Sequence, residues 1–219
     1  MVQKNRKAAV PPKAASPPSP KRRGRPRAYE PDVALGKALD LFRKGGFAAT
    51  SLDDLSAATG MNRPSLYGAF GDKRELYIKS YQRYRDDARA ASLDIFRQEM
   101  PIRQRLARIY AVALDIYLSG ESGPRGCFTV MTAGSEAVAD PEIRAMVVDA
   151  LLQLDRAFAN CFRLAKEKGE LREGADPEVL AQLASATIHT IAIRARAGVP
   201  REELEAIVNG AIEVMVGKA

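Results

Sequence analysis

The chain has 219 residues, 46% of them hydrophobic, which is enough to bury a core in one large domain or two modest ones. It contains no apolar run of roughly 18 residues and no signal-peptide pattern, so we expect a soluble cytoplasmic protein with no membrane partner. Its net charge is +7, and residues 1–30 hold nine Lys or Arg against one acid, so the whole excess lies in this segment.

Residues 1–28 are predicted to form a disordered basic arm. The arm holds six of the 13 prolines and has no apolar face, which favours nucleic acid over a membrane surface as its partner. Its run Lys21-Arg22-Arg23-Gly24-Arg25-Pro26-Arg27 resembles an AT-hook core, which would place Arg25 and Arg27 in a narrow minor groove. The alternative is an arm that contacts only phosphates.

Residues 29–75 are predicted to form a compact domain of three helices. The first begins at Pro31 and stops at Gly45-Gly46. The second opens on Ser51, which forms a capping box with Asp54, and ends at Gly60. The third runs from its N-cap, Asn62, to Phe70, and a long fourth helix follows from Asp72 and Glu75.

Two short helices joined by a glycine-containing turn are typical of a helix-turn-helix, whose second helix enters the major groove of DNA. The outward positions of that helix are Arg63, Ser65, Tyr67 and Gly68. Arg63 can donate to guanine O6 and N7 or to a phosphate, and Ser65 and Tyr67 can bond a phosphate or a base edge. Any αα-hairpin gives a similar pattern, so this spacing alone leaves DNA binding open.

The resemblance to a known family is more specific. The chain from Tyr29 to Tyr81 resembles the DNA-binding domain of the TetR family of repressors through Ala38-Leu39-Asp40-Leu41-Phe42, Gly45-Gly46-Phe47, Thr50-Ser51-Leu52, Ala58-Thr59-Gly60-Met61, Ser65-Leu66-Tyr67, Phe70 and Lys73. The resemblance implies that Arg63, Pro64, Ser65 and Tyr67 face the groove or its phosphates. It also implies that Thr50 and Ser51 approach one phosphate and Lys73 another. Many relatives have His where this chain has Ala69, so the resemblance does not carry over the phosphate contact that such a His would make.

Residues 76–219 are predicted to form a larger helical domain for effector binding and dimerisation. After the long fourth helix, further helices begin at Pro101, after Gly126, at Asp140, at Asp176 and at Pro200. We therefore expect an all-α fold of about nine helices, with no strand signal between them.

The last two predicted helices are apolar around most of their circumference, and such helices must bury a second side. A second copy of the same pair would supply the partner in a four-helix bundle, and the family resemblance implies the same homodimer. The residues expected at this interface are Leu183, Thr187, Ile191, Leu204, Ile207, Val208 and Ala211. His189 lies in the same stretch and is read as a packed histidine.

A pocket for a small hydrophobic effector is expected among the fourth to seventh predicted helices. Its candidate lining is Phe96, Tyr110, Leu114, Tyr117, Cys127, Phe128 and Met131. The plain alternative is that these residues form ordinary core. Cys127 follows Arg125 at a predicted helix start, so a repressor that senses oxidants, electrophiles or a thiophilic metal through this thiol is a second hypothesis.

Enzyme function is not expected. The sequence has no glycine-rich phosphate loop, no His/Cys metal cluster and no histidine near a candidate nucleophile, and we expect no cofactor. The sequence thus predicts a transcriptional regulator. We expect it to be a repressor that binds double-stranded operator DNA and is released from the DNA by a small-molecule effector. A non-specific architectural DNA-binding protein is the alternative from a different class.

Overall fold

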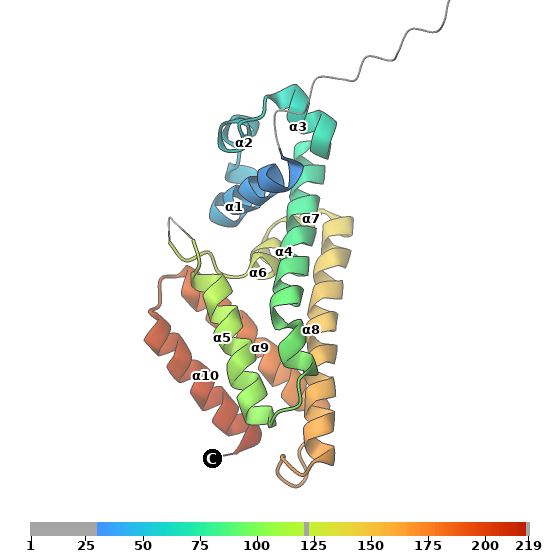
Figure 1. Ribbon diagram of the computed structural model, residues 1–219, viewed down its shortest axis with the longest axis vertical. Helices are drawn as coiled ribbons and strands as arrows, with labels where there is room; N and C mark the ends of the chain where they lie inside the picture. The colour runs from blue at the N-terminus through green and yellow to red at the C-terminus, as the bar shows by residue number, and fades with distance from the viewer. Residues whose placement is uncertain (1–29, 121–122, 218–219) are drawn as a thin grey trace, which may run out of the picture.

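The computed structural model describes residues 30–120 and 123–217, and this part of the chain is all-helical, with ten helices and no strand (Figure 1). The helices are α1 (Pro31–Ala49), α2 (Leu52–Thr59), α3 (Arg63–Phe70), α4 (Lys73–Arg97), α5 (Ile102–Leu118), α6 (Phe128–Gly134), α7 (Glu136–Ala139), α8 (Pro141–Glu167), α9 (Pro177–Arg196) and α10 (Arg201–Val216).

The all-α prediction is confirmed, and the described residues form ten helices where about nine were expected. One helix was expected between Gly126 and Asp140, whereas the backbone breaks within this stretch at Ser135, with φ −129° and ψ −91°. The break separates α6 from the short α7, which Asp140 then separates from α8. Hydrophobic spacing gave no sign of the break because Ala137, just beyond it, is still buried.

The capping hydrogen bonds predicted for α2, α3 and α4 are all present in the structure. Ser51 and Asp54 form a capping box, the Asn62 side chain accepts from the Ser65 N–H, and Asp72 and Glu75 form a second box. Local hydrogen bonds therefore fix where α2, α3 and α4 begin, independently of the larger domain.

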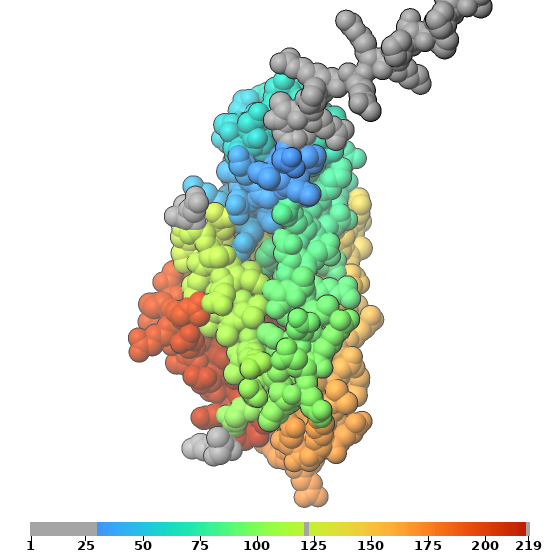
Figure 2. Space-filling view, in the orientation of Figure 1, coloured from blue at the N-terminus to red at the C-terminus, as the bar shows by residue number. Residues whose placement is uncertain are grey.

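Helices α1–α3 form one end of an elongated molecule, and α4 runs from that end into the larger bundle (Figures 1 and 2). In the bundle, α8 packs closely on α9, while α5 packs on both α9 and α10. Because α4 is continuous through residue 75, the small domain and the bundle share one helix.

An aromatic cluster fills the space between α1, α4 and α6. The Phe128 ring is fully buried, with its centroid 5.2 Å from that of Tyr77, 5.7 Å from that of Tyr81 and 5.8 Å from that of Tyr84. Tyr77 in turn makes an edge-to-face contact with Phe42 at 5.0 Å. These contacts join α6 to α1 through α4, so they hold the two domains together.

Arginine side chains make a second link between the domains. Arg43 of α1 is buried, and its Nη2 donates to the carbonyl oxygens of Ile116, at 2.9 Å, and of Gly126, at 3.2 Å. Arg196 of α9 donates to the Arg43 carbonyl oxygen at 2.9 Å. Gly126 has a φ of 63°, and a Cβ there would lie 2.7 Å from the Ala192 carbonyl oxygen, so only glycine allows this approach.

Replacing Phe128 by Ala should destabilise the protein by about 3–5 kcal/mol, because it removes the ring at the centre of the cluster and leaves a cavity. Urea unfolding followed by far-UV circular dichroism measures the loss. Phe96→Ala is the matched control. Because the Phe96 ring is only half-buried, this substitution should lower the free energy of unfolding clearly less than Phe128→Ala does. Equal losses for the two variants would contradict a central role for Phe128.

Candidate nucleic-acid interface and ligand pocket

The outward face of α3 is open. Tyr67 is 46% exposed, and Pro64 and Gly68 are also exposed. A Cβ on Gly68 would meet no atom within 4 Å, so no other part of the described chain covers this face. Leu66 and Phe70 point the other way and are buried. The helix is therefore anchored by its apolar side and free to contact a groove with its polar side.

Arg63 is held in place by the helix before it. Its Nη2 lies 2.8 Å from Asp53 Oδ1 of α2, and both side chains are more than half exposed. Such a pair contributes little to stability, so the guanidinium can exchange this partner for a base edge or a phosphate. Ser65, in the first turn of α3, is half-buried.

The two residues expected to approach a phosphate before α2 differ in position. Ser51 is exposed and its hydroxyl caps α2. Thr50 is only 4% exposed, and its hydroxyl donates to the Gly46 carbonyl oxygen at 2.7 Å. This hydrogen bond stabilises the kinked C-terminal end of α1, so the Thr50 side chain has a structural role and does not face solvent.

Lys73 is the first residue of α4, next to the end of α3. Its Nζ lies 4.2 Å from the centroid of the Phe47 ring, a cation–π contact that holds the ammonium near the N-terminal end of the helix. Arg25 and Arg27, the other predicted DNA contacts, lie outside the described residues.

A pocket of about 750 Å³ lies between α4 and α8, with α5 and α9 forming its inner wall. Phe96, Tyr117 and Cys127 line it, as the sequence predicted. Tyr110, Leu114, Phe128 and Met131, the other predicted residues, are not in its wall. The first three are almost fully buried, and Tyr110 donates to the Ala184 carbonyl oxygen at 3.2 Å, so they belong to the core.

Sequence reasoning missed most of the pocket wall. The apolar part comes from α5, α4, α8 and α9 and includes Leu93, Ile109, Val112, Ala113, Ile116, Leu151, Leu154 and Ile188. Arg89, Arg156 and His189 also line the pocket, and the sequence did not predict them because hydrophobic periodicity identifies only apolar and aromatic side chains. His189 was predicted to be a packed interface residue. In the structure it is half-buried and lines this pocket.

Cys127 joins the pocket to the aromatic cluster. The Tyr84 hydroxyl donates to its Sγ at 3.4 Å, and burial together with the neighbouring thiol raises the pKa of Tyr84 well above its usual value. Arg125, which the sequence suggested as the neighbour that would favour a thiolate, forms an ion pair with Asp40 of α1 instead.

The predicted interface residues fall into two groups. Leu183 is 45% exposed, and Ile207 and Ala211 are half-buried. The others lie in the core of the chain itself and leave no surface for a partner: Thr187, Ile191, Leu204 and Val208. The exposed apolar side chains that the prediction lacked are Val179 and Ile193 of α9 and Val214 of α10.

Within residues 30–120 and 123–217, no group of three or more His, Cys, Asp or Glu is arranged to hold a metal ion. No helix in that part of the chain is long and apolar enough to cross a membrane.

Two family models match the chain. Residues 34–79 match the model described as bacterial regulatory proteins, tetR family, and residues 103–211 match that of the tetracyclin repressor-like C-terminal domain. The first match covers α2, α3 and their flanking segments, and the second covers most of the bundle.

Similar proteins agree with these matches. ComR of Escherichia coli strain K12, an HTH-type transcriptional repressor, is 30% identical over 185 residues, which is 84% of this chain and 88% of ComR. The structure of a cysteine-substituted CifR, a TetR family transcriptional regulator complexed with 26-bp double-strand operator DNA, has a TM-score of 0.76 at 29% identity and covers 88% of this chain and 100% of CifR.

More distant structures share the fold alone. FadR of Bacillus subtilis, solved in complex with stearoyl-CoA, has a TM-score of 0.69 at 14% identity and covers 87% of this chain and 100% of FadR. The matches at both ends, the helix-turn-helix with its open recognition face, and the relatives named as regulators lead to one conclusion. This chain belongs to the TetR family and is a DNA-binding transcriptional regulator, not an enzyme.

Proposed function

We propose that the protein is a homodimeric repressor that binds operator DNA through α3. A small molecule bound in the α4–α8 pocket releases the protein from the DNA. The observation that carries this proposal is that α4, which forms one side of the pocket, is also the helix on which α3 is mounted. A ligand that favours a different position of α4 therefore changes the position of the recognition helix.

The contacts to DNA in this proposal come from α3 and its neighbours. Arg63, Pro64, Ser65 and Tyr67 face the major groove or its phosphates, while Ser51 and Lys73 contact the backbone on either side. Arg25 and Arg27 of the arm add contacts in the minor groove or to phosphates. CifR, solved on operator DNA, supports this reading over a non-specific architectural role.

The proposed dimer surface is the outward side of α9 together with α10. Val179, Leu183, Ala186 and Ile193 recur on α9 at intervals of four, three and seven residues, which places them on one stripe, and all four are exposed. Ile207 and Val214 add apolar surface from α10. A second copy of the same stripe would cover these side chains in an isologous four-helix arrangement.

A second candidate is release through the thiol of Cys127. The observation that favours it is that Cys127 lines the pocket, where an electrophile or thiophilic metal would meet it. Two observations argue against this candidate. The Cys127 side chain is buried, and Arg125, which was expected to favour the thiolate, forms an ion pair with Asp40. Cys127→Ser separates the two: it should abolish release by electrophiles or copper and leave release by a neutral hydrophobic compound intact.

Tyr67→Ala and Lys73→Ala should weaken operator binding at every sequence, because they remove contacts near the backbone. Arg63→Ala should cost about 1–3 kcal/mol and relax the preference at one position of each half-site, as expected when a bidentate contact to guanine is lost. Gel shifts on a selected palindromic operator measure both effects. Arg97→Ala, which removes a charge at the far end of α4, is the control, and full-strength binding by the Tyr67 and Lys73 variants would rule out α3 as the recognition helix.

Leu183→Asp and Ile193→Asp should convert the dimer into folded monomers, because each places a charge in the proposed interface but leaves the core of the chain unchanged. Sedimentation velocity gives the oligomeric state, and circular dichroism confirms folding. Val148→Asp is the control, since Val148 is equally exposed but lies on α8. If that variant alone dissociates, the interface lies on α8.

Val112→Phe should keep operator binding and lose release by small hydrophobic compounds, because the larger ring occupies the pocket. Gel shifts with a panel of such compounds, octanol among them, compare it with the wild type. Ala111→Phe is the matched control, since Ala111 is exposed and outside the pocket wall. Unchanged release from Val112→Phe would mean that the compounds act elsewhere.

A further inference from the structure

The wall of the α4–α8 pocket is divided between an apolar inner surface and a charged opening. The inner surface is formed largely by Ile109, Val112 and Ile116 of α5 and Ile188 of α9. The volume of about 750 Å³ lies in the range of pockets that enclose a drug-sized molecule. Such a surface binds a hydrocarbon or aromatic body without regard to the rest of the molecule.

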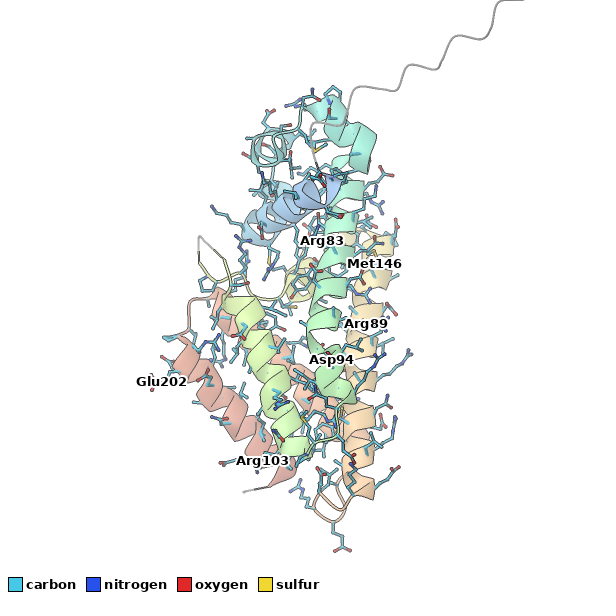
Figure 3. All side chains as sticks on the ribbon, viewed as in Figure 1. Arg83, Arg89, Asp94, Arg103, Met146 and Glu202 are labelled. Atoms are coloured by element: carbon cyan, nitrogen blue, oxygen red, sulfur yellow. The ribbon has the colours of Figure 1, made fainter. Side chains whose placement is uncertain are left out.

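The opening is lined by two polar stripes that face each other. On α4, Arg85, Arg89 and Ser92 follow one another at helical spacing, and on α8 Gln153, Arg156 and Asn160 do the same. Figure 3 shows Arg89 on the side of α4 toward α8. Both stripes line the same pocket, so a ligand inside it passes between them.

The charges of this opening are not balanced. Arg85 is paired with Asp149, at 2.8 Å. No described carboxylate lies within 4.0 Å of the guanidinium of Arg89 or of Arg156, and Asp86 is the single acid in the pocket wall. Two arginines therefore reach the opening without an ion-pair partner among residues 30–120 and 123–217.

His189 adds no charge to the opening. Burial lowers the pKa of its imidazole, opposed in part by the nearby Asp155 carboxylate, so the ring is neutral near pH 7. A neutral imidazole in the wall can hydrogen-bond a polar atom of a ligand. The electrostatic preference of the opening thus comes from the two arginines.

We infer that the ligand of this pocket is a small organic anion, with an apolar body against α5 and a carboxylate between Arg89 and Arg156. The inference rests on the proposed effector function of the pocket. A planar guanidinium binds a carboxylate through two parallel hydrogen bonds, and two such groups at an apolar cavity favour an amphipathic acid over its neutral analogue.

Octanoate and octanol test this inference, because they share a hydrocarbon body and differ in charge. Isothermal titration calorimetry on the full-length protein should show octanoate binding more tightly by at least about fivefold. Arg89→Gln combined with Arg156→Gln should remove that preference and leave the affinity for octanol unchanged. Arg108→Gln combined with Arg172→Gln removes the same net charge at exposed sites outside the pocket and should keep the preference.

Equal affinity of the wild-type protein for the two compounds, or a preference that survives in the Arg89/Arg156 variant, would overturn the inference. Loss of the preference in the Arg108/Arg172 variant would overturn it as well, since the effect would then be one of net charge alone. The proposed function is judged separately: if octanol releases operator DNA and Val112→Phe blocks that release, the pocket function stands even where the anion preference fails.

Discussion

The burial of the Arg43 guanidinium constrains the whole arrangement of the two domains. A charged group removed from water needs hydrogen-bond acceptors, because leaving it unpaired costs several kcal/mol. Its acceptors are the carbonyl oxygens of Ile116, near the end of α5, and of Gly126, next to Cys127. Ile116 and Cys127 both line the pocket, so the C-terminal part of α1 is bonded directly to the pocket wall.

Two ion pairs of Arg74 fix α4 at the end nearest α2 and α3. The Arg74 guanidinium bonds Asp140 at 2.6 Å and Glu142 at 2.7 Å, and it holds the pKa of Asp140 at about 2. The stability that this pair adds is present above the usual pKa of a carboxyl and is lost only as the pH falls toward 2. Farther along, the pocket separates α4 from α8. In the proposed mechanism, a ligand that spreads the helices there tilts α4 about its fixed end, and α3 moves with it.

Local signals in the sequence predicted α2, α3 and the start of α4 well, because capping boxes and turn glycines act over a few residues. The pocket wall was predicted poorly, since helical periodicity identifies an apolar face but not the element that this face contacts. Tyr110 and Leu114 were assigned to the pocket although they pack in the core. Arg89 and Arg156 were missed because an exposed arginine on a helix is ordinary until its neighbours across a groove are known.

The same ambiguity explains the assignments on α9. Its apolar residues cover most of the circumference, from which the sequence predicts more than one contact surface. In the structure, Ile191 faces the chain's own helices, whereas Leu183 and Ile193 are exposed. A charge at 191 would therefore destabilise the fold of the chain itself, while in the proposed dimer a charge at 193 would act only on the contact between the two copies. Distinguishing the two requires the angular position of each residue relative to α5 and α8, which depends on packing between elements distant in the sequence.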